Sequence, residues 1–500
     1  VASGKKSDAS KTWHRHKMFL TEAANRGSVS TGYDIDNSLK LESDNTERVN
    51  KGAGTISGAG NRRTFTISFW TKRTEINGVK QYLFEAGNSD NNTDRFTLRF
   101  GTGDTFDIQS QNTWLVTNRV FRDTSAWYHF VIKVDTTDGT AANRIKLYVN
   151  GVEETSFSTD NRSSINQNHD FPVNNTEDHI IGNSQIEGSL YYNGYIAEWI
   201  QLDGTAAAPT SFGEFDEDSG IWKPKDPSAL SFGTNGFWLD FEDSSNLGND
   251  ASGGTDFTLT NVAAADQATD TPTNNFATFN PLLTHGANDY FVVTNGSTHL
   301  DQTGQVGWGT STATMAFNLG KWYAEFKLGS GVDVTMIGNS QIDDPQNYSA
   351  SHLGVSANAT SIGMGYYSAN GLMYRNGGST SYGDSYNTSG TIIGVALEFE
   401  ANGTASMYVS KNGTWQNSAD PAAGSGGFDL YYGNALPTGL HFTFAVSTYN
   451  NDGNIEANFG GFDGFTVSSG NTDANGYGNF EHAVPSGYYA LCTKNLAEYG

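Results

Sequence analysis

The sequence contains one cysteine, Cys492, among its 500 residues. A disulfide within the chain needs two cysteines, so the protein is not a small secreted module that disulfides hold together. We therefore expect it to fold in a reducing cytoplasm. The chain also lacks any apolar run near the roughly 20 residues of a membrane-spanning helix, which argues against membrane insertion. It opens with Val-Ala-Ser-Gly-Lys-Lys and no hydrophobic leader, so no signal peptide is expected.

Basic residues are scarce: 29 Lys and Arg stand against 54 Asp and Glu, for a formal net charge of −25. Residues 1–26 nevertheless hold six basic and two acidic side chains, so the excess negative charge lies in the rest of the chain. Because such a body repels polyanions, nucleic acid is not expected as a partner. The basic arm is predicted to become ordered on a partner subunit, and a flexible tail is the alternative.

Proline is also scarce, at 10 residues, whereas glycine (58) and aromatic residues (13%) are abundant. This mixture favours short strands joined by tight turns, and it holds few of the residue types that fill helices. A chain of 500 residues is too long for one ordinary core. We therefore expect at least two folded β domains.

Residues 390–416 give the clearest strand signal. Apolar side chains alternate with others in both halves of this stretch, which is the period of a half-buried strand. Asn402-Gly403 and Asn412-Gly413 supply the residues that tight hairpin turns favour. We predict two successive antiparallel hairpins, with Glu398 and Glu400 on the polar, solvated side of the first strand.

Similar alternation recurs along both halves of the chain and predicts an all-β fold. It consists of two antiparallel β-sandwich domains of the jelly-roll type, an acidic connector and a basic N-terminal arm. Within the connector, residues 236–241 and 257–259 are expected to form a strand pair. The predicted units are residues 1–26 (arm), 27–203 (first sandwich), 204–280 (connector), 281–492 (second sandwich) and 493–500 (tail).

Tyrosines gather in two parts of the sequence and are candidate ligand-binding residues. Tyrosine presents a flat apolar face and a hydroxyl, which suit a sugar ring or a protein partner. The alternative, which we favour for most of them, is packing in the core or between subunits. The candidates are Tyr366, Tyr367, Tyr374, Tyr382 and Tyr386 in one group, and Tyr191 and Tyr192 in the other.

Acidic side chains cluster in the connector and are candidate metal ligands. Ca²⁺ prefers hard oxygen ligands gathered on loops, although the spacing here does not match an EF-hand. Clustering by chance in a very acidic chain is the alternative. The sequence suggests no cofactor besides Ca²⁺, and its candidate ligands are Asp240, Glu242, Asp243 and Asp250.

No catalytic group is predicted. Glu214 and Asp216 alternate as the carboxylates of a retaining glycosidase can, but their glycine-rich surroundings indicate a solvated acidic loop. The sequence has no nucleophile elbow, phosphate-binding loop or dinucleotide fingerprint. We therefore expect that the protein is not an enzyme.

Two stretches resemble known domain families. The first sandwich resembles the laminin G-like type of concanavalin A-like domain, and the second resembles a SPRY domain. In the second, Glu398 and Glu400 stand where that family usually has Asp. The segments that carry the first resemblance are GNRRTFTISFWTKR, WYHFVIKVDTTDGTAANRIKLYVNGVEETSF and YYNGYIAEWIQLDG; those that carry the second are GKWYAEFKL, GLMYRNGGSTSYGDSY, IIGVALEFEANGTASMYVSKNG and IEANFG.

Two further segments resemble the sequences of tail or fibre-type structural proteins of marine bacteriophages. They are WLVTNRVFRDTSAWYH and SFGEFDEDSGIWKPK. This resemblance implies a virion protein (a tail fibre, spike or capsid decoration) that is assembled in the host cytoplasm and attaches to the host surface. It implies that the arm binds other virion proteins, that the sandwiches bind a host-surface glycan or protein, and that the chain forms a homo-oligomer, a trimer by analogy. The alternatives are a free carbohydrate-binding lectin and, less favoured, a glycan depolymerase.

Overall fold

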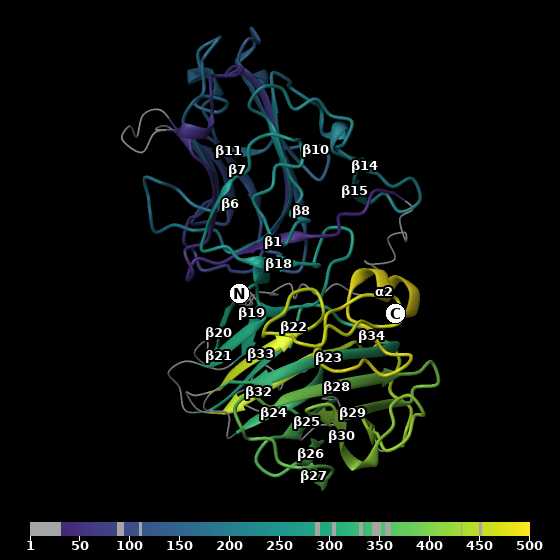
Figure 1. The fold of residues 1–500 in the computed structure, drawn as a ribbon. Helices are drawn as coiled ribbons and strands as arrows, with labels where there is room; N and C mark the ends of the chain where they lie inside the picture. Colours follow the sequence, from purple (N-terminus) through teal and green to yellow (C-terminus); the bar gives the residue numbers. More distant parts are fainter. Residues whose placement is uncertain are drawn as a thin grey trace, which may run out of the picture.

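The computed structural model describes residues 32–87, 95–109, 113–285, 291–302, 307–329, 334–342, 352–355, 362–431, 433–449 and 453–500. These residues form two bodies, one above the other in Figure 1. Each body contains two large, almost wholly antiparallel sheets around an apolar core, which confirms the predicted all-β fold. The basic arm, residues 1–26, lies outside the described residues.

The first sandwich holds two eight-stranded sheets. In one sheet the order is β10-β9-β8-β3-β13-β1-β18, with β16 paired to β13; in the other it is β11-β7-β6-β5-β4-β12-β2-β17. The first sheet comprises β1 (Ser38–Leu41), β3 (Thr64–Arg73), β8 (Tyr128–Asp135), β9 (Ile145–Val149), β10 (Val152–Glu153), β13 (Gly194–Asp203), β16 (Phe237–Leu239) and β18 (Gln267–Ala268). The second comprises β2 (Arg48–Lys51), β4 (Gln81–Gly87), β5 (Arg95–Phe100), β6 (Thr105–Gln109), β7 (Thr113–Val120), β11 (Phe157–Asp160), β12 (Asp178–Ile181) and β17 (Thr258–Thr260).

Residues 237–268, within the predicted connector, complete both sheets of this sandwich. The expected strands form at β16 and β17, but the predicted pairing between them is wrong, because β16 pairs with β13 and β17 with β2. The physical reason is burial: Phe237 and Phe257 both belong to the core of the first sandwich, and each strand therefore extends a different sheet. A separate hairpin, β14 (Gly213–Phe215) and β15 (Trp222–Pro224), lies in the same connector.

The second sandwich holds sheets of seven and nine strands. Their orders are β19-β22-β32-β24-β25-β26-β27 and β20-β21-β33-β23-β28-β29-β30, with β31 on β29 and β34 on β23. The seven strands are β19 (Phe279–His285), β22 (Trp308–Ala313), β24 (Thr335–Gln341), β25 (Gly363–Tyr367), β26 (Leu372–Arg375), β27 (Gly378–Ser381) and β32 (Phe442–Tyr449). The nine are β20 (Phe291–Thr294), β21 (His299–Gln302), β23 (Gly320–Leu328), β28 (Ile392–Phe399), β29 (Ala405–Lys411), β30 (Thr414–Trp415), β31 (Phe428–Asp429), β33 (Asn454–Asn458) and β34 (Tyr489–Ala490).

Helical structure in the described residues is short. The helix α2 (Thr493–Tyr499) closes the chain and buries Leu496 in the core of the second sandwich. The 3₁₀ turns are η1 (Ala53–Thr55), η2 (Ala141–Asn143), η3 (Arg162–Ser164), η4 (Pro209–Ser211), η5 (Ala264–Asp266) and η7 (Gln416–Ser418). No helix in the part of the chain that the structure describes is long and apolar enough to cross a membrane.

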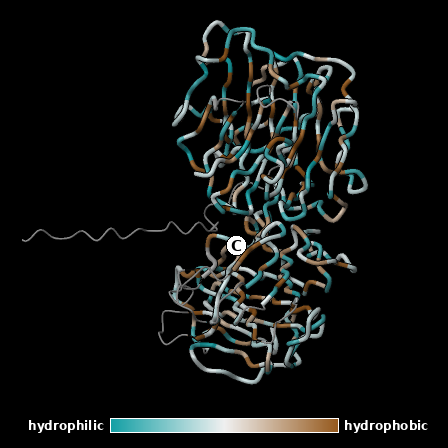
Figure 2. The backbone as a smooth tube through the Cα atoms, turned by 90° about the vertical axis from the view of Figure 1, so that its left-hand side faces the viewer, coloured by the Kyte–Doolittle hydropathy of each residue, from teal (hydrophilic) through white to brown (hydrophobic). Residues whose placement is uncertain are grey.

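The hairpins predicted in residues 390–416 are confirmed. Strand β28 pairs with β29 so that Val395 faces Val409, and β29 then pairs with β30. The turn between β29 and β30 has positive φ at both Asn412 (47°) and Gly413 (77°), as the tight turn needs. Hydrophobic segments of this kind lie mainly inside the two bodies, whereas hydrophilic segments occupy most of the surrounding loops (Figure 2).

The solvated position expected for Glu398 is wrong. Its side chain is buried, its Oε1 lies 2.6 Å from Lys321 Nζ, and the Tyr408 and Tyr488 hydroxyls donate to its Oε2 at 3.1 and 3.3 Å. The reason is that residues 471–492, here called the C-terminal cover, pack over this outer side of the sheet. Glu400, at the following turn, is exposed as predicted.

Buried polar contacts join the two sandwiches. Lys72 Nζ lies 2.7 Å from Asp270 Oδ2, and Trp127 Nε1 donates to Asp270 Oδ1 at 3.0 Å. The Tyr195 hydroxyl donates to the Gly296 carbonyl at 2.6 Å. Asp270 lies between β18 and β19, and its amide donates to the Gly461 carbonyl of the second sandwich at 3.0 Å. Because Gly296 and Gly461 belong to the second sandwich and Lys72 and Tyr195 to the first, these bonds fix how the two bodies meet.

Candidate functional site

Four of the seven candidate tyrosines are core residues, which corrects their prediction as ligand-binding groups. Tyr366, Tyr382 and Tyr386 lie in the core of the second sandwich, and Tyr192 lies in that of the first. Tyr366 and Tyr386 stack with ring centroids 4.9 Å apart, and burial raises the pKa of both hydroxyls. Side chains on a strand alternate between its two sides, so Tyr366 points inward and its neighbour Tyr367 points outward.

The outward tyrosines belong to an aromatic group that the sequence did not reveal. We call it the aromatic face, and its rings lie in a connected series: Trp308 to Tyr449 at 5.3 Å, Trp308 to His352 at 4.7 Å, His352 to Tyr374 at 5.5 Å and Tyr374 to Tyr367 at 5.6 Å between centroids. All five side chains are partly exposed. The aromatic face therefore comprises Trp308, His352, Tyr367, Tyr374 and Tyr449.

Strand pairing assembles this group from distant parts of the chain. Trp308 on β22 faces Tyr449 on β32, and Tyr367 on β25 faces Met336 on β24. The order β22-β32-β24-β25-β26 then carries the series across the outer side of the sheet to Tyr374. No local pattern signals this, because the aromatic face spans residues 308–449 and its members meet only through sheet order.

A small apolar base supports the aromatic face. Met336, Leu353 and Ala445 are buried and pack against Trp308, Tyr367 and Tyr374. The Leu353 amide donates to Ser447 Oγ at 3.1 Å, and Ser447 Oγ in turn lies 2.6 Å from Thr310 Oγ1. These bonds tie the backbone beside His352 to the sheet, so the rings are held in position before any ligand arrives.

His352 adds a neutral ring to this surface. Its Nδ1 lies 2.9 Å from the Leu353 carbonyl, which can only accept, so Nδ1 carries the proton and Nε2 is left as an acceptor. Burial lowers the pKa of His352, which favours the uncharged ring. The aromatic face therefore offers flat apolar rings together with hydroxyl, indole and imidazole groups that hydrogen-bond.

Tyr191, the remaining candidate, is partly buried in the first sandwich. Its hydroxyl accepts a hydrogen bond of 3.4 Å from Arg48 Nη1. It is not joined to the aromatic face, and its sequence neighbour Tyr192 points into the core. The two tyrosines therefore do not form a second binding group.

The four carboxylates predicted to bind Ca²⁺ are not brought together. Across the described ranges, no three His, Cys, Asp or Glu side chains are gathered closely enough to hold a metal ion. Instead the carboxylates organise separate turns: Asp243 accepts from the Ser245 amide at 2.9 Å, and Asp250 accepts from the Trp238 amide at 3.1 Å and lies 3.5 Å from Lys51 Nζ. The four predicted ligands were Asp240, Glu242, Asp243 and Asp250.

Glu214 and Asp216 lie at the β14–β15 hairpin. Lys223 Nζ is 3.6 Å from Glu214 Oε1 and 3.2 Å from Asp216 Oδ2, so one lysine bridges both carboxylates. Asp216 also accepts from the Ser219 amide at 2.9 Å, which orders the turn. Both carboxylates therefore belong to a turn that one lysine and the Ser219 amide hold in place.

A buried Ser–His contact in the first sandwich was also missed by the sequence. Ser68 Oγ lies 2.9 Å from His129 Nε2, while Trp222 Nε1 donates to His129 Nδ1 at 3.0 Å. Because the indole can only donate, Nδ1 is the acceptor. Nε2 therefore carries the ring proton and donates a hydrogen bond to Ser68 Oγ. His129 therefore cannot take a proton from Ser68, and burial lowers its pKa to about 3.

The buried carboxyl of Glu198 on β13 should make the free energy of unfolding depend on pH. Glu198 has a positive φ of 50° at a bulge, accepts from the Tyr33 hydroxyl at 2.7 Å and from Trp238 Nε1 at 2.8 Å, and burial raises its pKa from 4.5 to about 8. Between these values the folded chain holds a proton that the unfolded chain releases, so stability falls as pH rises. We expect this group to contribute a slope of at most about 1.4 kcal/mol per pH unit between pH 6.5 and 8.

Urea unfolding at several pH values checks this expectation. The Glu198→Gln variant should show a flatter decline in the free energy of unfolding between pH 6.5 and 8 than the native chain. The lower limit avoids His129, whose depressed pKa acts in the opposite direction below 6.5. Equal slopes for the two proteins would contradict the assignment.

One family model matches part of the chain. Residues 50–200 match the family model Laminin_G_3, described as the concanavalin A-like lectin/glucanases superfamily. This match supports the concanavalin A-like character predicted for the first sandwich. No curated protein sequence matches the chain at the significance that we required.

Several solved structures are similar over about a third of the chain. They include a human SPRY domain (20% identity, 34% of this chain and 94% of that chain, TM-score 0.25). A heptameric SAP-like pentraxin from Limulus polyphemus matches with 15% identity, 35% and 80% coverage and a TM-score of 0.27. The CBM40 of a Ruminococcus gnavus IT-sialidase, bound to α2,6-sialyllactose, matches with 15% identity, 33% and 91% coverage and a TM-score of 0.22. Likenesses of this size carry no argument about what this chain does.

Proposed function

We propose that this protein binds carbohydrate and that the aromatic face is its contact surface. The observation that carries the proposal is the connected series of five partly exposed, uncharged rings on one side of a sheet. Aromatic rings have an electron-rich face, which attracts the C–H hydrogens on the flat side of a sugar, and their polar edges bond hydroxyls. The family match of residues 50–200 supports a lectin-like function in general terms.

Charge favours a glycan over a nucleic acid. Bases also stack on aromatic side chains, but binding of single strands needs a positively charged groove along the backbone. The chain carries a net charge of −25, and none of the five side chains of the aromatic face is basic apart from the neutral His352. A polyhydroxyl ligand without phosphates meets no such repulsion.

We further propose that the chain is a structural protein of a phage virion (a tail fibre, spike or capsid decoration) and attaches to a host-surface glycan. The resemblance of two sequence segments to phage fibre-type proteins supports this assignment. In this proposal the protein is not an enzyme, its basic arm contacts other virion proteins, and the chain forms a homo-oligomer, a trimer by analogy. Immunogold labelling of purified particles tests it; a protein found only free of particles would exclude it and leave a free lectin.

Replacing Trp308 with alanine tests the binding surface. The native chain is first screened on a glycan array, and the affinity of its best glycan is then measured by calorimetry. Trp308 touches both His352 and Tyr449, so its loss breaks the series, and we expect the dissociation constant to rise about 30-fold, as for a central interface tryptophan.

Phe215→Ala is the matched control, because Phe215 is an exposed aromatic residue on the first sandwich. It should leave the affinity unchanged. Circular dichroism confirms that both variants are folded, and Tyr374→Ala provides a second break in the series. Absence of any bound glycan, or native affinity in the Trp308→Ala and Tyr374→Ala variants, would rule out the proposed surface.

A further inference from the structure

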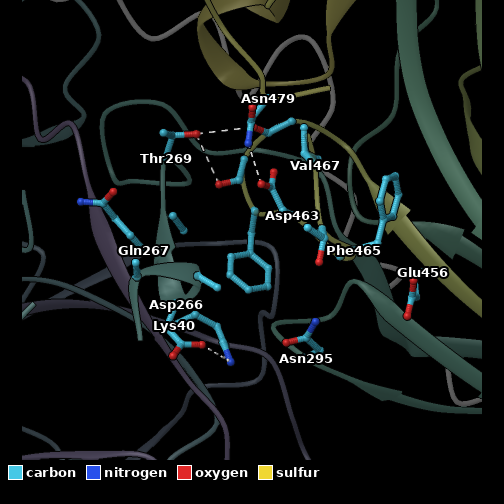
Figure 3. A pocket seen from close by; sticks show the side chains of 18 of the residues that line it. Lys40, Asp266, Gln267, Thr269, Asn295, Glu456, Asp463, Phe465, Val467 and Asn479 are labelled. Carbon is cyan, nitrogen blue, oxygen red and sulfur yellow. Dashed lines mark hydrogen bonds and ion pairs between the residues drawn. The ribbon is translucent and has the colours of Figure 1, made fainter. Parts of the chain in front are cut away.

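A cavity of about 750 Å³ lies where the two sandwiches meet. We call it the seam cavity; Figure 3 shows side chains from both bodies around it. Its walls include Lys40 of β1, Gln267 of β18, Asn295 of the turn after β20, and Asp463 of the loop after β33. It shares no lining residue with the aromatic face, so it is a separate site.

The seam cavity is held open by bonds between the two bodies. The Thr269 amide donates to the Gly461 carbonyl at 2.8 Å, which ties the segment after β18 to the loop after β33. On the same wall Lys40 Nζ lies 5.6 Å from the centroid of the Phe462 ring. Together with the buried pair of Lys72 and Asp270, these contacts give a cavity that exists before a ligand binds.

The charges in the walls disfavour an anionic ligand. Among the described lining residues, both lysines are already paired: Lys40 Nζ is 2.8 Å from Asp266 Oδ1, and Lys327 Nζ is 2.8 Å from Glu456 Oε2. Asp463 is instead bonded to an amide, since Asn479 Nδ2 donates to its Oδ2 at 2.6 Å. The walls therefore carry more negative than positive charge, which repels phosphates, sulfates and sialic acids.

The remaining polar groups both donate and accept hydrogen bonds. Side-chain amides supply N–H and C=O together, and the Asp463 carboxylate accepts. Hydroxyls are the ligand groups that satisfy both kinds of partner without bringing charge. The amide-bearing side chains of the walls are Asn37, Asn45, Gln267, Asn295 and Asn479. The side-chain N–H groups of Asn45, Gln267 and Asn479 already donate to Glu47, to the Phe241 and Glu242 carbonyls and to Asp463, so these three contribute mainly their carbonyl oxygens.

We propose that the seam cavity binds a neutral oligosaccharide, with the Asp463 carboxylate as the anchoring acceptor for its hydroxyls. The inference goes beyond the aromatic face, since it gives the chain a second sugar site with its own selectivity. A ligand there contacts both sandwiches at once, and it therefore stabilises their junction as well as being held by it.

The test uses the full chain carrying Trp308→Ala, so that the aromatic face does not contribute. Calorimetry measures binding of five neutral probes: maltotriose, cellotriose, xylotriose, mannotriose and triacetylchitotriose. At least one is expected to bind, whereas 3′-sialyllactose is expected not to. Adding Ala265→Trp, at an exposed residue of the cavity wall, should block that binding.

Asp463→Asn is the milder variant and keeps the shape of the wall. It should weaken binding about tenfold or more at pH 7.5, because a hydrogen bond to a charged acceptor is replaced by a neutral one. Burial raises the pKa of Asp463 to about 6, so binding by the chain with Asp463 should weaken at pH 5, and this pH dependence should be absent from Asp463→Asn.

Three results would overturn the seam site: no binding of any of the five probes, binding that survives Ala265→Trp, or an unchanged affinity in Asp463→Asn. None of them bears on the aromatic face, which is tested with the single variants Trp308→Ala and Tyr374→Ala. Conversely, if the aromatic face proves not to bind glycans, the seam measurements remain valid, because they use the chain that carries Trp308→Ala.

Discussion

Replacing Lys72 with methionine is expected to lower the free energy of unfolding by about 3–5 kcal/mol. Lys72 Nζ lies 2.7 Å from Asp270 Oδ2, and both side chains are almost fully buried, at 0% and 1% exposed. The ammonium also donates to Asn275 Oδ1 at 2.8 Å and to the Phe276 carbonyl at 3.1 Å. Removing it leaves the Asp270 carboxylate without a cation in a buried position, and this uncompensated charge is the main cost.

Urea unfolding monitored by fluorescence gives this free energy. Arg63→Met is the matched control, because the pair of Arg63 and Asp170 has a similar distance of 2.7 Å but side chains that are 45% and 46% exposed. Solvent screens such a pair, and its loss should cost less than about 1 kcal/mol. If Lys72→Met lowers the free energy of unfolding as little as the control does, the junction of the two sandwiches does not depend on the buried pair.

Because Lys72 lies in the first sandwich and Asp270 in the segment that leads to the second, the same variant should loosen their junction. We expect calorimetric unfolding to separate into two transitions, one for each sandwich, where the native chain shows stronger coupling. Loss of stability without any change in this coupling would place the cost within the first sandwich alone.

Replacing Glu325 with alanine should destabilise the second sandwich by about 3 kcal/mol. The Glu325 carboxylate accepts hydrogen bonds of 2.8 Å from the Glu481 and His482 amides and one of 2.9 Å from the Tyr323 hydroxyl. The two amides belong to the C-terminal cover. The variant therefore leaves these half-buried N–H donors without their acceptor and removes the anchor of that segment.

Hydrogen exchange follows this anchor directly. The Glu481 and His482 amides should exchange much faster in Glu325→Ala, with a smaller increase in Glu325→Gln, which keeps an acceptor. Glu400→Ala is the control on the same sheet, because Glu400 is exposed, and it should change the free energy of unfolding by less than about 0.5 kcal/mol. Unchanged exchange in Glu325→Ala would mean that other contacts hold the cover.

Local sequence determined the strands. The alternation in residues 390–416 and the Asn-Gly pairs predicted β28, β29 and β30 and their turns, because strand period and positive φ depend on neighbouring residues. The family resemblance and the composition predicted two all-β sandwiches, as observed.

Tertiary structure decided which side chains reach solvent. The alternation of Ala396 and Glu398 with apolar neighbours predicted a solvated outer side. The C-terminal cover, which lies about 80 residues later in the sequence, packs on this side and buries both residues. Tyr366 and Tyr367 are adjacent and chemically alike, yet one lies in the core and the other on the surface. The sequence names the type of residue, while the direction of each side chain follows from the register of its strand.

The candidate sites show the same division. Tyrosine content pointed to the region of β25 and β26, and Tyr367 and Tyr374 of the aromatic face were among the candidates. Trp308, His352 and Tyr449 were not, because they join these tyrosines only through the strand order β22-β32-β24-β25-β26. The seam cavity depends on contacts between two bodies, and no pattern within either one encodes it. Local periodicity determined the elements of this protein, and long-range packing determined its surfaces.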